Sequence, residues 1–60
     1  MRHLRTAEGD VLEAIRRLEA EACEYRQRGQ SAVREEDRRV LDHKADILEE
    51  TAKYLRARLP

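Results

Sequence analysis

The sequence predicts an all-α fold: an antiparallel two-helix hairpin (coiled coil) that dimerises into a four-helix bundle. Apolar residues recur in alternating steps of three and four along two segments, and no segment alternates with the period of two typical of strands. Helix-breaking residues fall at Gly9, Gly29 and Pro60, which leaves room for two helices. A single domain of 60 residues with one cysteine and no zinc motif buries too little surface to be stable alone, so we expect a homodimer.

The first helix is expected over residues 10–28, after a polar leader at residues 1–9. Asp10 is a suitable N-cap residue, and Glu13 three residues later completes an approximate capping box. Apolar side chains follow a heptad-like rhythm along this helix, at Val11, Ile15, Leu18, Ala22 and Tyr25. We expect this row to line the core of the bundle.

The second helix is expected over residues 32–59, after a turn at residues 29–31. Ser31 is a candidate N-cap, and the acidic residues 35–37 suit the positive end of the helix dipole. Its core row is Leu41, Ala45, Leu48, Ala52, Leu55 and Leu59, with three further apolar residues alongside, Val40, Ile47 and Tyr54. This face is wider than a two-stranded coiled coil needs, which favours a bundle of two hairpins.

Composition and motifs argue against several classes of function. Basic and acidic residues balance at 13 each, whereas general DNA- or RNA-binding proteins carry a basic excess. No apolar run matches a signal peptide or a membrane span, so we expect a cytoplasmic protein without a membrane partner. Phosphate-binding loops and nucleophile motifs are missing, so we expect no enzymatic activity. The single Cys23 is expected to pack between helices rather than to react.

The best candidate for a metal site is the helical face that carries His43, Asp46 and Glu50. The Glu-x-x-His pairing that di-iron bundles use is absent from it. We therefore expect no metal and no resident cofactor, and a small metal-binding bundle is the third and last alternative.

Two arginines interrupt the apolar row of the second helix. Extending the row backwards from Leu41 gives Arg38 and then Arg34, where apolar residues are expected. One interpretation is a solvated, salt-bridged helix start, because surface ion pairs are common and weak. The other is a polar site for a planar, anionic ligand or for a charged partner surface.

The segment 38–48 resembles the signature of RsiG-type anti-sigma factors, also described as aerial mycelium formation proteins of actinobacteria. A helix in that family carries paired arginines, two aliphatic residues, a basic residue and then Asp-Ile-Leu. Here these fall on Arg38, Arg39, Val40, Leu41, Lys44, Asp46, Ile47 and Leu48. The resemblance implies that the protein binds cyclic di-GMP and holds a sporulation- or flagellar-type sigma factor inactive. Because one motif copy is present, two chains would each supply half of a ligand site.

The family's ligand motif, Glu-x3-Ser-x2-Arg-x3-Gln-x3-Asp, fits in two registers. In the first, Arg38 and Asp46 match its Arg and Asp, and three positions depart from it: Ser31, Glu35 and Asp42. In the second, which spans Gly29, the motif falls on Gln27, Ser31, Arg34, Arg38 and Asp42. A carboxylate can accept both guanine N1–H and N2–H, while an arginine can bind guanine or phosphate. The predicted ligand residues are therefore Ser31, Arg34, Glu35, Arg38, Asp42 and Asp46.

The alternative function is a homodimeric helical-hairpin adaptor that docks a partner protein without a small ligand. Nucleotide binding distinguishes it from the anti-sigma hypothesis, because an adaptor gives no response to cyclic di-GMP. Both hypotheses predict the same bundle core, with Val11, Ile15, Leu18, Leu41, Leu48 and Leu55 as its larger side chains.

Overall fold

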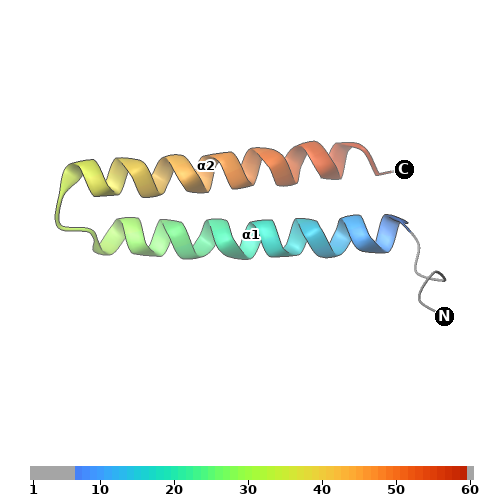
Figure 1. Ribbon diagram of the computed structural model, residues 1–60, viewed down its shortest axis with the longest axis horizontal. Coiled ribbons are helices and arrows are strands. Elements are labelled where there is room, and N and C mark those ends of the chain that lie inside the picture. The colour runs from blue at the N-terminus through green and yellow to red at the C-terminus, as the bar shows by residue number, and fades with distance from the viewer. Residues whose placement is uncertain (1–6, 60) are drawn as a thin grey trace.

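The computed structural model describes residues 7–59, with side chains from residue 9, and consists of two antiparallel α-helices (Figure 1). Helix α1 spans Ala7–Ser31 and helix α2 spans Glu35–Ala57. The two helices lie side by side, joined by the short connection at residues 32–34, and no strand occurs among the described residues. The predicted all-α hairpin is confirmed. Residues 1–6 of the predicted leader lie outside the described residues.

The first helix begins at Ala7 rather than at Asp10. Asp10 therefore lies inside the first turns of α1, and residues 7–9 of the predicted leader are helical. Glycine in a helix interior costs only about 1 kcal/mol relative to alanine. Gly9 therefore does not end a helix whose later turns are held by packing against α2. The predicted N-cap at Asp10 is wrong.

The connection between the helices lies at residues 32–34, and the predicted turn at 29–31 is wrong. Helix α1 continues through Gly29 to Ser31, and the amide of Ala32 donates to the Gly29 carbonyl at 3.2 Å. Arg34 rather than Ser31 is the N-cap residue of α2, and its side chain makes no capping hydrogen bond. The acidic residues 35–37 do occupy the first turn of α2, as predicted.

Gly29 belongs to the packing of the two helices. It is buried and has no positive φ. A Cβ at this position would lie 3.0 Å from Asp42 Oδ1 and 3.6 Å from Leu41 Cβ. The absence of a side chain at Gly29 therefore lets α1 and α2 approach closely beside the turn. This packing outweighs the intrinsic helix-breaking tendency of glycine.

The second helix ends at Ala57, two residues before the predicted end. The amides of Arg58 and Leu59 donate to the carbonyls of Leu55 and Arg56 at 3.1 and 3.2 Å. These i to i−3 bonds tighten the last turn of the chain, which is common at helix ends.

The fully buried core is a narrow seam of small side chains. Its members are Ile15, Ala22, Ala45 and Ala52, and only Ile15 is larger than alanine. Alanines at the contact let two helices lie close together, because the distance between helix axes depends on the side chains at the contact. The other predicted core residues are only half-buried: Val11, Leu18, Leu41, Leu48 and Leu55. Two helices form one layer, so a side chain at the flank of the seam is covered from one side only.

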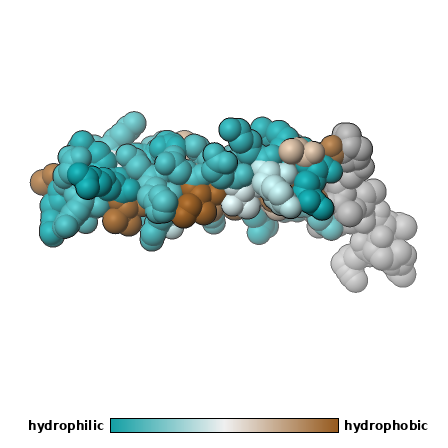
Figure 2. All heavy atoms as spheres, turned by 90° about the horizontal axis from the view of Figure 1, so that it is seen from above, coloured by the Kyte–Doolittle hydropathy of each residue, from teal (hydrophilic) through white to brown (hydrophobic). Residues whose placement is uncertain are grey.

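Several larger apolar side chains remain exposed on the hairpin. Val40, Ile47 and Tyr54 stand seven residues apart along α2 and are 54%, 51% and 61% exposed. A spacing of seven keeps them in one row, beside the half-buried leucines one residue further on. Figure 2 shows hydrophobic patches between the hydrophilic side chains that cover most of one face of the molecule.

Candidate functional site

The six predicted ligand residues do not form one cluster. Ser31 is exposed at the end of α1, and Arg34 lies in the connection, where its Nη2 donates to Glu36 Oε1 at 3.0 Å. The other four share α2 at steps of three, four and four, so they follow one side of that helix: Glu35, Arg38, Asp42 and Asp46. Neither predicted motif register is therefore contained in one helix.

Arg38 caps the C-terminal end of α1. Its Nε donates to the Gly29 carbonyl at 3.3 Å, and its Nη2 donates to the Ala32 carbonyl at 3.4 Å. The last carbonyls of a helix have no partner within the helix, and a cationic donor also suits the negative end of the helix dipole. This contact gives a structural reason for an arginine at a position where the heptad rhythm asks for an apolar residue.

Asp46 binds an arginine of the opposite helix. Arg26 Nη2 donates to Asp46 Oδ1 at 2.7 Å and to Glu49 Oε1 at 2.7 Å, while Arg26 Nε donates to Glu49 Oε2 at 3.0 Å. The guanidinium thus makes a two-point contact with one carboxylate and a single contact with the other. The hydrogen bonds from Arg26 hold the pKa of Glu49 below its ordinary value of 4.5. The same bonds raise the pKa of Arg26, so Arg26 and Glu49 are both charged at neutral pH.

A second cross-helix ion pair lies further along the same side of the hairpin. Arg56 Nη2 donates to Glu19 Oε2 at 2.7 Å. A hollow of about 300 Å³ lies nearby, lined by Glu19, Glu49, Ala52, Lys53 and Arg56. We call the side formed by Arg26, Asp46, Glu49, Glu19 and Arg56 the charged edge. Its ion pairs are exposed and stabilise the fold little, and each joins opposite charges of α1 and α2.

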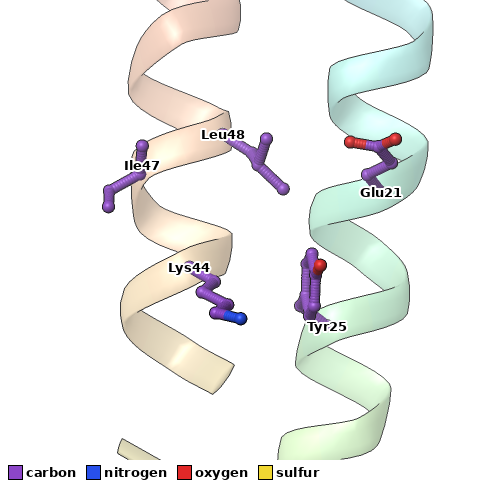
Figure 3. Close-up of a pocket in the computed structure, with 5 residues that line it drawn as sticks. All are labelled: Glu21, Tyr25, Lys44, Ile47 and Leu48. Carbon is purple, nitrogen blue, oxygen red and sulfur yellow. The ribbon is translucent and has the colours of Figure 1, made fainter. Parts of the chain in front are cut away.

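An apolar hollow opens where α1 and α2 meet at Tyr25 (Figure 3). It measures about 230 Å³ and is lined by Glu21, Tyr25, Lys44, Ile47 and Leu48. Leu48 and Lys44 point toward α1, whereas Ile47 points away from it. The Lys44 ammonium lies 5.6 Å from the centre of the Tyr25 ring, a cation–π contact. We call Tyr25 and the neighbouring apolar pairs of α2 the apolar edge: Val40, Leu41, Ile47, Leu48, Tyr54 and Leu55.

The remaining candidate residues do not assemble into a chemical centre. Within residues 9–59, no group of three or more His, Cys, Asp and Glu side chains is placed to hold a metal ion. Neither described helix combines the length and the hydropathy that crossing a membrane requires. Cys23 is exposed rather than packed between the helices, because it follows Ala22 and is rotated about 100° from the seam. The Sγ atom of Cys23 lies 3.8 Å from Gln27 Nε2.

Arg26 and Glu49 are the main site residues that the sequence analysis missed. Each looks like an ordinary exposed charge on its own helix, and no local motif marks it. The signal lies in their positions: Arg26 directly follows Tyr25, and Glu49 directly follows Leu48, both of which were predicted core residues. Long side chains at such flanking positions are the ones that form ion pairs between helices.

Comparisons with protein-family models, with curated proteins and with solved structures found no match to this chain. Function must therefore be inferred from the residues and their geometry. Both hollows are shallow and open to solvent, and the described side chains offer exposed apolar area and exposed charge pairs. Such surfaces suit non-covalent association better than enclosure of a reacting substrate.

Proposed function

We propose that this chain is a protein-association module that dimerises into a four-helix bundle and docks a partner protein, with no chemistry of its own. The observation that carries the proposal is the incomplete burial of the seam. Leu18, Leu41, Leu48 and Leu55 are half-buried, and Ile15 is the only fully buried side chain larger than alanine among the described residues.

The energetics of a single hairpin support association. Burial of apolar surface contributes roughly 25 cal/mol per Å², and a seam of one isoleucine and three alanines offers little of it. The cross-helix ion pairs are exposed, so they add little to the free energy of unfolding. Short helices rely on tertiary packing rather than on intrinsic propensity. A second layer of helices would bury the half-covered leucines and supply the missing packing.

The proposed dimer makes thermal stability depend on protein concentration. We expect the unfolding midpoint, followed by far-ultraviolet circular dichroism, to rise steadily over a roughly hundredfold increase in concentration, because mass action favours the folded dimer. Sedimentation equilibrium over the same range should give twice the chain mass at the upper end. A constant midpoint together with the mass of one chain would contradict the proposal.

A second candidate function names the partner and a ligand: an anti-sigma factor that binds cyclic di-GMP and sequesters a sporulation- or flagellar-type sigma factor. It is favoured by the alignment of Arg38, Asp42 and Asp46 along one side of α2, with Arg26 of α1 beside Asp46. Carboxylates suit the guanine edge and guanidinium groups suit the phosphates. To reach Asp46, the ligand would have to break the hydrogen bond between Asp46 and Arg26. To reach Arg38, it would have to break the hydrogen bonds from Arg38 to the carbonyls at the end of α1.

This second function predicts a nucleotide response that depends on Asp46. We expect saturable heat when the protein is titrated with cyclic di-GMP and none with GMP. Asp46→Asn should abolish the response, because an amide presents a donor to the guanine edge where a carboxylate presents a second acceptor. The matched control is Asp37→Asn, an exposed aspartate in the first turn of the same helix, which should bind normally.

Circular dichroism of Asp46→Asn establishes that its helices are intact, which separates loss of binding from loss of fold. Absence of heat from the unmodified protein, alone and with a purified sigma factor of either class, would contradict the second function. The association module would remain, because its test is the oligomeric state.

A further inference from the structure

The two edges of the hairpin differ in whether their side chains have partners within the chain. The charged edge pairs its charges within the chain, between Arg26, Asp46 and Glu49 and again between Arg56 and Glu19. The apolar edge leaves large side chains and an open hollow exposed. We propose that a second copy of this chain docks on the apolar edge, so that the charged edge stays at the outside of the dimer. The inference rests on the proposed function and assigns its dimer to one surface.

The apolar edge runs along most of the length of α2. From Val40 to Leu55 it covers 16 residues of helix, and the 15 steps between them span about 22 Å at 1.5 Å per residue. Exposed and half-buried apolar side chains alternate along this length in pairs seven residues apart. A stable interface buries about 800 Å² on each partner, so the adjacent side of α1 must contribute to it together with α2.

The charges at the rim of the apolar hollow are complementary within one chain. Glu21 comes from α1 and Lys44 from α2, on opposite sides of Tyr25 and Leu48 (Figure 3). Among the described residues, neither side chain takes part in an ion pair. In a two-fold dimer the same patch meets itself, so each contact occurs twice. A patch that carries both signs can then place Lys44 of one copy against Glu21 of the other at two equivalent positions.

The charged edge is a poorer place for the second copy. Two copies meeting there would have to remove water from carboxylates and guanidinium groups that are already paired within each chain. The free-energy cost of removing water from charges exceeds the Coulombic gain from newly formed ion pairs, unless the geometry of those pairs is very good.

The proposal is tested with Ile47→Glu, with Val33→Glu as the matched control. Both remove a β-branched apolar side chain that is at least half exposed, but Val33 lies in the connection and is 96% exposed. In sedimentation equilibrium we expect Ile47→Glu to raise the dimer dissociation constant about a hundredfold, since a buried unpaired charge penalises an interface strongly. Val33→Glu should leave it unchanged.

A charge exchange at the rim provides an independent measurement. Glu21→Lys and Lys44→Glu should each weaken the dimer, and the double variant should recover most of the loss. A dimer that resists Ile47→Glu and shows no recovery in the double variant overturns the assigned surface while leaving the proposed association intact. A monomer at every concentration in the unmodified chain overturns both.

Discussion

Replacing Ala45 with leucine is expected to destabilise the hairpin more than any other single enlargement of a side chain. Ala45 is 0% exposed and belongs to the buried seam between α1 and α2. Three added carbon atoms have no space there, so the helices must separate or the leucine must adopt a strained rotamer. Overpacking of this kind costs about 1–3 kcal/mol, a large part of the stability available to a small fold. Urea unfolding at fixed protein concentration, followed by circular dichroism, measures the loss.

Ala20→Leu is the matched control for this prediction. Ala20 is exposed in the middle of α1, so the same added volume meets only solvent. Its effect should stay within about 0.5 kcal/mol, because exposed substitutions away from special features change stability little. An Ala45→Leu protein as stable as the control would mean that α1 and α2 do not pack against each other at the alanine seam.

The alanine seam and the hairpin were predictable from the sequence because both depend on periodicity alone. Steps of three and four place Ile15 and Ala22 on one face of α1 and Ala45 and Ala52 on one face of α2. Two such faces separated by a short connection have few ways to pack other than an antiparallel pair. The depth of burial was less predictable, since it depends on how many layers cover each side chain.

The position of the turn was not predictable from local preferences. Gly29 and Ser31 are both common where helices end or begin, which placed the turn at 29–31. The structure instead uses Gly29 for close packing against Leu41 and Asp42, and α1 continues to Ser31. Local propensity is a weak signal, and a tertiary contact of this kind overrides it.

The contacts of the predicted ligand residues depend on that same turn. Extending α1 to Ser31 brings its final carbonyls within reach of the Arg38 guanidinium. The alignment of the two helices also sets Asp46 opposite Arg26, a partner that is 20 residues away in the sequence. A motif on one helix reveals neither contact, because each one depends on how the second helix is aligned with it.

These contacts also bear on the anti-sigma proposal. In this hairpin Arg38 and Asp46 already have partners within the chain, and Glu49 beside Asp46 adds negative charge that opposes a doubly anionic nucleotide. Binding of cyclic di-GMP would need to exchange those contacts for stronger ones. The association module requires no such exchange, which is why we propose it as the primary function.

Truncating Ile15 to alanine is expected to have the largest effect of any deletion of side-chain atoms. Ile15 is 1% exposed and is the largest fully buried side chain of the described hairpin. An isoleucine-to-alanine change in a core costs about 2–5 kcal/mol, from the lost transfer energy and the cavity that remains. Ile15→Val should cost about 0.5–1.5 kcal/mol by the same reasoning. Leu12→Ala, at a 45% exposed position of the same helix, is the control and should cost much less.

The Ile15 series also separates the fold of the hairpin from its association. Ile15 lies in the seam between α1 and α2 of one chain, so its truncation should lower the unfolding midpoint at every protein concentration. The slope of the midpoint against the logarithm of concentration should persist, because the apolar edge is untouched. Ile47→Glu should have the opposite effect. It should reduce the slope of the midpoint against concentration, while the seam between α1 and α2 stays packed. Loss of the slope in Ile15→Ala with fold retained would mean that Ile15 belongs to the contact between chains.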